Sequence, residues 1–224
     1  MVGARLVVFD CDGTLVDGQH AIFAAMTDAF GDHRIEAPTP AAVRRVVGLP
    51  LAEALRWLAP EADSARLAAL AQAYKDSFLR RRQSPGHYEP LFPGALETLD
   101  GLLEKGFLLG VATGKSRQGL AATLERHDLL QHFSILKTSD DGPGKPSPHM
   151  LICAMSDAGV GPVSTVMIGD TVFDMEMARS AKVPAVGVNW GYHEGAELEA
   201  AGAVAVIREF GELPALIERL IGRT

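Results

Sequence analysis

The chain has little cysteine, with only Cys11 and Cys153 among its 224 residues. Two cysteines are too few for a disulfide framework, and their spacing fits no zinc-binding motif. The sequence also lacks an apolar run of the roughly 20 residues that a membrane-spanning helix needs. Its first residues, MVGARLVVFD, show neither a basic leader nor a signal-peptide cleavage site. We therefore expect a cytoplasmic protein that has no membrane partner.

Basic residues are outnumbered by acidic ones, at 21 Lys and Arg against 28 Asp and Glu, for a net charge of −7. A non-specific nucleic-acid binder needs a basic face that displaces counterions from phosphates, so we expect no nucleic-acid partner. Any recognition of an anion must come from a local site. With 47% hydrophobic residues, the chain is long enough for one large domain or for a domain that carries an insertion.

Buried strands are predicted at six short apolar segments that are rich in β-branched residues. They cover residues 4–10, 107–113, 134–138, 165–169, 185–189 and 203–207. Helix-length amphipathic stretches separate most of these segments, which is typical of a parallel sheet with helices on both faces. The predicted fold class is therefore α/β, with a Rossmann-like parallel sheet as the core.

The interval between the first two predicted strands is far longer than one crossover helix requires. It is rich in Ala, Leu, Arg and Glu at helical spacing, with helices expected at residues 20–30, 40–46, 51–58 and 64–82. We predict an inserted all-helical domain at residues 16–88 and a core made of residues 1–15 and 89–224. Pro85-Gly86 and residues 90–94 are the predicted return hinge.

Two pairs of aspartates follow predicted strands. Asp10 and Asp12 leave the first strand at its carboxyl end, where open α/β sheets bind their ligands. Asp170 and Asp174 follow the strand at 165–169, and their spacing of four places both on one face of a helix. If the two strands are neighbours, these carboxylates converge and repel one another unless a cation neutralises them. Oxygen ligands without His or Cys favour a hard ion, so we expect Mg²⁺.

Each pair also has a purely structural explanation. Asp10 and Asp12 precede Gly13, and aspartate and glycine are common turn residues. Asp170 stands where the N-cap of the following helix is expected, which is a frequent reason for an aspartate. The coincidence of both pairs at strand ends favours a functional site.

A candidate phosphate site follows the strand at 107–113. Thr113 and Gly114 offer a hydroxyl and backbone amides near a helix start, which suit a phosphoryl oxygen. The segment from Gly110 to Ser116 looks like a nucleotide P-loop, but it has three residues between its glycines instead of four, which excludes that motif. Lys145 precedes another predicted helix and can bring an ammonium to the same pocket. The alternative for Lys145 is a solvated surface lysine.

Taken together, these segments resemble the four ordered motifs of the haloacid dehalogenase (HAD) superfamily. In this chain the motifs are Asp10-x-Asp12-Gly13-Thr14-Leu15-Val16-Asp17, Thr113-Gly114, Lys145-Pro146 and Gly169-Asp170-Thr171-x-x-Asp174. The resemblance covers nearly the whole chain. The helical insertion directly after the first motif resembles the cap of the phosphoglycolate phosphatase-like branch.

The resemblance implies a role for each motif. Asp10 is expected to be the nucleophile that forms an aspartyl-phosphate, and Asp12 the general acid and then base. The implied metal ligands are the Asp10 carboxylate, the Asp12 backbone carbonyl and Asp170, with Asp174 ligating or orienting. The implied holders of the phosphoryl oxygens are Thr113, the Gly114 amide and Lys145.

The resemblance also ranks the possible activities. Dehalogenases and phosphonate-cleaving members lack an aspartate at the position of Asp12, so both activities are disfavoured. We expect hydrolysis of a small phosphate monoester, with phosphoglycolate as the first guess. A phosphosugar mutase and a pyrophosphatase of the same superfamily remain alternatives. A non-catalytic binding protein on this fold is disfavoured by the intact set of motif residues.

Residues of the insertion are expected to select the leaving group. Gly48-Leu49-Pro50-Leu51, between two predicted helices, resembles the family's substrate-specificity loop. Arg44 and Arg45 precede this loop and are candidates to meet a substrate carboxylate. Two positions depart from the family pattern: Gly18 stands where Ser or Thr is frequent, and Lys182 stands where glycine is usual. Neither departure touches a predicted catalytic position.

Overall fold

The strands of the described chain form one parallel sheet. The computed structural model describes residues 3–84, 86 and 89–221. Its strands are β1 (Leu6–Phe9), β2 (Leu108–Ala112), β3 (Ile135–Lys137), β4 (Thr165–Gly169), β5 (Ala185–Val188) and β6 (Ala205–Ile207), in the order β3-β2-β1-β4-β5-β6. Each strand lies within its predicted segment, and the predicted α/β fold with a Rossmann-like core is confirmed.

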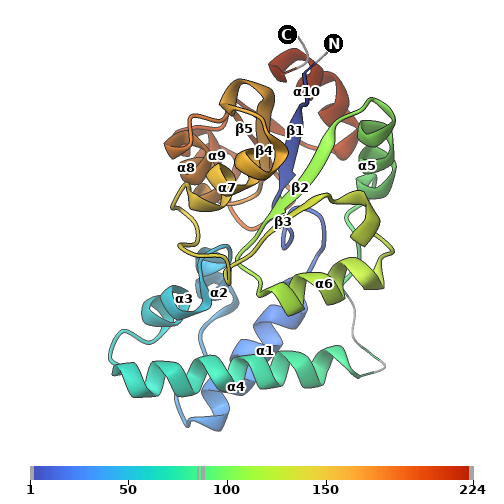
Figure 1. Ribbon diagram of the computed structural model, residues 1–224. Helices are drawn as coiled ribbons and strands as arrows, with labels where there is room; N and C mark the ends of the chain where they lie inside the picture. The colour runs from blue at the N-terminus through green and yellow to red at the C-terminus, as the bar shows by residue number, and fades with distance from the viewer. Residues whose placement is uncertain (1–2, 85, 87–88, 222–224) are drawn as a thin grey trace.

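Helices cover both faces of the sheet (Figure 1). Both faces need cover because successive apolar side chains along each strand point to opposite faces. Val7 and Phe9 of β1 pack with the helices of one face, and Leu6 and Val8 pack with those of the other. The first face carries α5 (Ala95–Glu104), α6 (Arg117–Arg126) and α10 (Leu213–Ile221), and the second carries α7 (His149–Ala158), α8 (Val172–Ser180) and α9 (Gly195–Ala201). Short 3-10 turns lie at Leu130–His132, Pro162–Ser164 and Phe210–Glu212.

The strand order places β1 next to β4. Phe9 of β1 pairs with Ile168 of β4, although 159 positions separate them in the chain. The connection after β1 leads to β2 on one side, and β4 begins the other half of the sheet. Ligands of such sheets bind at this reversal of strand order, beyond the carboxyl ends of the strands. Asp10 and Asp170 leave β1 and β4 at this edge.

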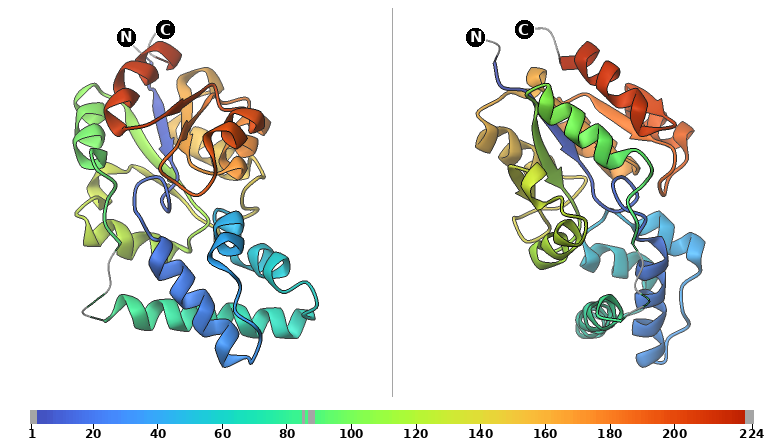
Figure 2. Two further views of the ribbon diagram at one scale, coloured as in Figure 1. Left: turned by 180° about the vertical axis from the view of Figure 1, so that it is seen from behind. Right: turned by 90° about the vertical axis from the view of Figure 1, so that its right-hand side faces the viewer.

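In the described part of the chain, four helices lie between β1 and α5 and stand apart from the layered sheet (Figures 1 and 2). They are α1 (Gln19–Asp32), α2 (Pro40–Val46), α3 (Leu51–Leu58) and α4 (Ser64–Arg82), close to the predicted ranges. Thr39 caps α2 and Asp63 caps α4, each accepting a hydrogen bond from a backbone N–H of the first turn. The group packs around an apolar cluster that includes Met26, Phe30 and Leu55, together with Tyr192 from the loop after β5.

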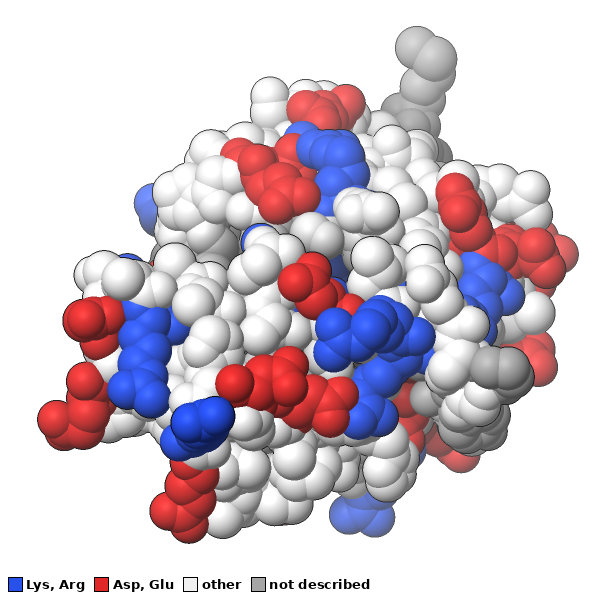
Figure 3. Space-filling view, turned by 90° about the horizontal axis from the view of Figure 1, so that it is seen from below, with Lys and Arg blue, Asp and Glu red and all other residues white. Residues whose placement is uncertain are grey.

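The predicted boundaries of the insertion, 16–88, stay a prediction. Tyr88, at its predicted end, and Pro85 of the predicted hinge lie outside the described residues. We use the name cap for α1 to α4 and the loops that join them. On the face seen from the cap end, described acidic and basic side chains lie next to one another (Figure 3). No helix in the described part of the chain has both the length and the apolar character to cross a membrane.

Candidate active site

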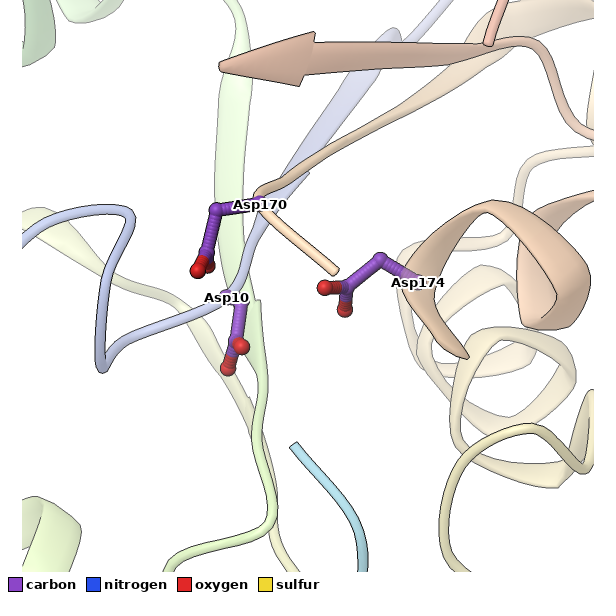
Figure 4. Close-up of side chains that lie close together, drawn as sticks. All are labelled: Asp10, Asp170 and Asp174. Carbon is purple, nitrogen blue, oxygen red and sulfur yellow. The ribbon is translucent and has the colours of Figure 1, made fainter. Parts of the chain in front are cut away.

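Three buried aspartates meet at the edge of the sheet where β1 and β4 end (Figure 4). Asp10 follows β1, Asp170 follows β4, and Asp174 lies in the first turn of α8. One carboxylate oxygen from each lies within 4.8 Å of those of the other two. The carboxylates are thus together, as expected from aspartates that follow neighbouring strands.

Hydrogen bonds fix the orientation of the Asp170 carboxylate. Its Oδ1 accepts a bond of 2.7 Å from the Thr14 hydroxyl, and its Oδ2 accepts one of 2.9 Å from the backbone N–H of Tyr192. Thr14 belongs to the turn after β1, and Tyr192 to the loop after β5. Segments that follow β1 and β5 therefore hold this carboxylate, which itself follows β4, in place.

The helix after β4 begins differently from what the sequence indicated. Its N-cap is Thr171, and Asp170 lies outside the helix. The Thr171 hydroxyl and backbone N–H both donate to Oδ2 of Asp174. The backbone N–H of Asp174 donates in return to the Thr171 hydroxyl oxygen, which completes a capping box. The expected i, i+4 helical pairing of Asp170 with Asp174 is therefore wrong. Their carboxylates meet because the chain turns into α8 between them.

Lys145 lies among the aspartates, and its side chain has no solvent exposure. Its Nζ is 2.8 Å from Oδ2 of Asp10 and 2.7 Å from Oδ1 of Asp174. Burial alone lowers the pKa of Lys145, but the charges of Asp10 and Asp174 outweigh burial and raise it. The alternative of a solvated surface lysine is therefore wrong.

The cluster carries excess negative charge. Burial raises the pKa of Asp10 to about 6, with Lys145 lowering it and Asp174 raising it further. Burial, and then the charge of Asp10, also raises the pKa of Asp170 well above its ordinary value. Three carboxylates and one ammonium leave a formal charge of −2 when all are ionised. A hard divalent cation would offset that charge, and the all-oxygen donor set fits Mg²⁺.

Asp12 takes a different set of partners. Its Oδ1 lies 2.9 Å from Nζ of Lys115, which also lies 3.6 Å from Oε1 of the buried Glu89. Burial raises the pKa of Asp12, and the Lys115 charge opposes that rise. The Asp12 side chain is thus directed to Lys115, not to the group of three aspartates.

The candidate phosphate site lies beside these groups. Thr113 is buried directly after β2, and its hydroxyl accepts a bond of 3.3 Å from the backbone N–H of Lys115. Helix α6 begins further on, with Ser116 as its N-cap. Asp10, Asp12, Thr113 and Gly114 all line one cleft of about 850 Å³ between the core and the cap.

The predicted specificity loop closes this cleft from the cap side. A Cβ added to Gly114 would lie 3.1 Å from the carbonyl oxygen of Gly48, and one added to Gly144 would lie 2.4 Å from Cγ of Pro50. Only glycine leaves room for contacts this close. The loop is therefore seated on the two core segments that carry Thr113 and Lys145.

Arg44 does not line this cleft. Its Nη2 donates to the carbonyl oxygens of Gly191 and Tyr192, at 2.8 Å and 3.1 Å, and so joins α2 to the loop that holds Asp170. Arg45 lies 2.6 Å from Glu197 of α9. Both arginines, considered from sequence as contacts for a substrate carboxylate, join the cap to the core instead.

The sequence reasoning missed Lys115, Glu89 and Tyr192. Lys115 directly follows Thr113 and Gly114 of the predicted phosphate motif, which was the available signal. Tyr192 follows β5 at the same edge of the sheet, so its position was the available signal. For Glu89 no local pattern marks its approach to Lys115.

Comparison with known proteins agrees with this arrangement. A probable phosphatase, IndB, from Dickeya dadantii is 36% identical over 93% of this chain and 91% of its own length. A phosphoglycolate phosphatase from Agrobacterium fabrum is 30% identical over 97% of this chain and 94% of its own.

Solved structures share the fold over nearly the whole chain. A haloacid dehalogenase-like hydrolase from Bacteroides fragilis superposes with a TM-score of 0.87 at 26% identity, covering 94% of this chain and 99% of its own. A protein from Thermotoga maritima, described as a β-phosphoglucomutase, superposes with a TM-score of 0.72 at 27% identity, covering 96% and 99%. The family model for haloacid dehalogenase-like hydrolases matches residues 7–188. With that match, and with its aspartates gathered at the ends of β1 and β4, the chain belongs to the haloacid dehalogenase-like hydrolase family.

Proposed function

We propose that this hydrolase is a Mg²⁺-dependent phosphatase that transfers the phosphoryl group of a small phosphate monoester to Asp10 and then to water. The observation that carries the proposal is the meeting of Asp10, Asp170 and Asp174 within 4.8 Å around Lys145. Two relatives that match over most of their length are named phosphatases, which supports the same reaction class.

In the first step, an oxygen of Asp10 attacks phosphorus and forms an aspartyl-phosphate. The bond from phosphorus to the alcohol oxygen breaks, and the protonated Asp12 gives its proton to that oxygen. Burial raises the pKa of Asp12, which favours the protonated form that this step needs. Lys115, at 2.9 Å, holds the Asp12 carboxyl beside the cleft.

In the second step, water attacks the phosphorus of the aspartyl-phosphate. Asp12, now a carboxylate, takes a proton from that water, and the bond between phosphorus and the Asp10 oxygen breaks. Phosphate leaves and Asp10 is restored as a carboxylate. Thr113, the Gly114 amide and the Lys145 ammonium are the proposed donors to the phosphoryl oxygens, where charge neutralisation supplies most of the catalysis.

The proposed metal ligands are the carboxylates of Asp10 and Asp170 and the backbone carbonyl of Asp12. Asp174 either binds the metal ion or orients the groups around it, since its Oδ2 is held by Thr171 and its Oδ1 by Lys145. Mg²⁺ at this place supplies the positive charge that offsets the clustered carboxylates and the phosphoryl oxygens.

The test is release of inorganic phosphate from a panel of phosphorylated metabolites. We expect turnover with Mg²⁺, none with a chelator, and a loss of at least about 1,000-fold for Asp10→Asn. Asp157→Asn, on the exposed surface of α7, is the matched control and should keep full activity. Full activity of Asp10→Asn would overturn the proposal.

A phosphosugar mutase is the second candidate because a structural neighbour is described as a β-phosphoglucomutase. A mutase converts a phosphosugar to its isomer and releases little phosphate, whereas a phosphatase releases phosphate with every turnover. Following isomer and phosphate together separates the two activities. Phosphoglycolate is the first compound to assay, since it is named for the relative from Agrobacterium fabrum.

We further propose that residues 16–88 form the cap domain and that residues 1–15 and 89–224 form the catalytic core. The apolar cluster of α1 to α4, to which the proposed core contributes Tyr192, supports this division. The small number of cysteines supports a reducing compartment such as the cytoplasm.

A further inference from the structure

The cleft is large for the leaving group of a two-carbon phosphate ester such as phosphoglycolate. Its volume is about 850 Å³. Pockets that enclose drug-sized ligands measure roughly 300–1,000 Å³, so this cleft is near the upper end. Asp10, Asp12 and Thr113 account only for the phosphoryl end. Most of the volume is left for the alcohol half of the substrate.

This volume does not arise from a cap that stands away from the core. The loop carrying Gly48 and Pro50 already touches Gly114 and Gly144 so closely that a Cβ on either glycine would collide or crowd. Arg44 of α2 also bonds to the loop after β5. The cleft therefore has this size with the cap in contact with the core.

The cap side of the cleft is mainly apolar. The partly exposed apolar side chains that line it are Val47, Leu49, Leu51, Tyr74, Phe78 and Leu79. Tyr74 and Phe78 lie one turn apart on α4, with ring centroids 5.9 Å apart and ring planes at 35°. Such an aromatic pair offers a ring-bearing ligand a large contact area with a preferred geometry.

Two cations that line the cleft already have partners within the protein. Lys115 is held between Asp12 and Glu89. Arg82 donates to the carbonyl oxygen of Gly119 and the hydroxyl of Thr123, across the cleft on α6. A carboxylate at Lys115 or Arg82 would have to compete with these contacts, whereas Lys75, which also lines the cleft, lies on the exposed surface of α4.

We infer that the alcohol half of the substrate carries a planar aromatic ring, as in a nucleoside monophosphate, and that Tyr74 and Phe78 select it. The inference rests on the proposed phosphatase function and names its substrate class. The ring packs against α4 and the loop at Val47 to Leu51, while the phosphoryl group lies at Asp10.

The test compares two phosphate esters, of which only one carries an aromatic base. Adenosine 5′-monophosphate and ribose 5-phosphate share the phosphoryl group and the sugar, and phosphoglycolate is the small acidic reference. We expect kcat/KM for adenosine 5′-monophosphate to exceed that for ribose 5-phosphate by roughly 10- to 100-fold, the range for stacking one base on aromatic side chains. Equal or better turnover of ribose 5-phosphate or phosphoglycolate overturns the inference and leaves the phosphatase proposal intact.

Variants of α4 assign the preference to its aromatic side chains. Phe78→Ala and Tyr74→Ala should each lower the ratio of kcat/KM between the two esters by roughly 10-fold. Phe78→Leu keeps an apolar side chain of similar size and should lower the ratio less. Arg80→Ala, on the exposed surface of α4 and outside the cleft lining, is the control and should keep the wild-type ratio. An unchanged ratio in folded Phe78→Ala and Tyr74→Ala overturns the assignment.

Binding separates this inference from the phosphatase proposal. If the wild-type chain releases no phosphate from any ester, the proposed function fails. The ring preference is then judged by calorimetric titration of Asp10→Asn with the same two esters. Tighter binding of adenosine 5′-monophosphate by roughly 10-fold supports the inference, and equal Kd values overturn it.

Discussion

The ammonium of Lys145 lies 2.8 Å from Oδ2 of Asp10, with both side chains buried at the end of β1. The pair joins a loop residue before α7 to the proposed nucleophile. Lys145 reaches Asp174 at 2.7 Å as well, so one cation bridges two carboxylates. Removing it leaves these buried charges without their cation.

Lys145→Met should therefore lower the free energy of unfolding by roughly 3–5 kcal/mol at neutral pH, as when one partner of a buried ion pair is removed. Denaturant unfolding of the metal-free protein measures it. Lys105→Met is the control, because Lys105 pairs with Glu218 on the exposed surface and its loss should destabilise the protein far less. Equal effects of the two variants would contradict the buried arrangement.

Mg²⁺ should raise the Tm of the wild-type chain, and a chelator should reverse the rise. The physical reason is that the ion binds the folded carboxylate cluster and not the unfolded chain. Asp170→Asn should abolish the response, since it removes one charged ligand while an amide can still accept the Thr14 hydrogen bond. A thermal melt with and without Mg²⁺ measures this. An unaltered response in Asp170→Asn would place the ion elsewhere.

Gly114→Ala should lower kcat/KM by roughly 10-fold while changing the free energy of unfolding by only about 1 kcal/mol. The new Cβ would lie 3.1 Å from the carbonyl oxygen of Gly48, so it pushes the cap loop away from the phosphate site. Gly101→Ala is the matched control. It meets no atom within 4 Å in α5 and should stabilise the helix by roughly 0.5–1 kcal/mol without affecting activity.

Asp28→Asn should destabilise the cap in a pH-dependent way. The Asp28 carboxylate accepts two hydrogen bonds from Arg81, at 2.7 Å and 2.8 Å, which join α1 to α4 and lower the pKa of Asp28 below 3.8. The pKa of Asp28 is thus lower in the folded chain than in the unfolded chain. The stabilisation is therefore complete at pH values above the unfolded-state pKa and is lost as pH falls through the folded-state pKa.

Because both side chains are more than a third exposed, the expected loss in Asp28→Asn at pH 7 is only roughly 0.5–1 kcal/mol. Denaturant unfolding at a series of pH values measures it. The difference between wild type and variant should shrink as pH falls below about 4, the ordinary pKa of aspartate, and should be smallest at the lowest pH at which the wild type is still folded. A difference that stays constant down to that pH would show that the pair does not titrate as described.

The sequence predicts the strands and the position of Asp10 and Asp170 because both depend on local patterns. A buried strand that ends in an aspartate is visible in a few residues. The adjacency of β1 and β4 depends on the order of the strands in the sheet, which no local pattern shows. The resemblance to the family motifs implied it, because it assigned Asp10 and Asp170 to one metal site.

The partners of the site residues were not predictable in the same way. Lys115 meets Glu89 across 26 positions of sequence, and Tyr192 reaches Asp170 across 22. These contacts depend on how loops leave different strands, which no periodicity records. The N-cap of α8 shows the same limit: Asp170 and Thr171 are both good caps, and tertiary bonds to Thr14 and Tyr192 decide between them.

The most direct test of the account is acid quenching of the enzyme during turnover of a good substrate with Mg²⁺, followed by mass spectrometry of its peptides. A phosphoryl group on the peptide that contains Asp10, absent in Asp10→Asn and discharged once substrate is exhausted, is the predicted result. Turnover by Asp10→Asn at the wild-type rate, with no phosphorylated peptide at any time, would contradict it.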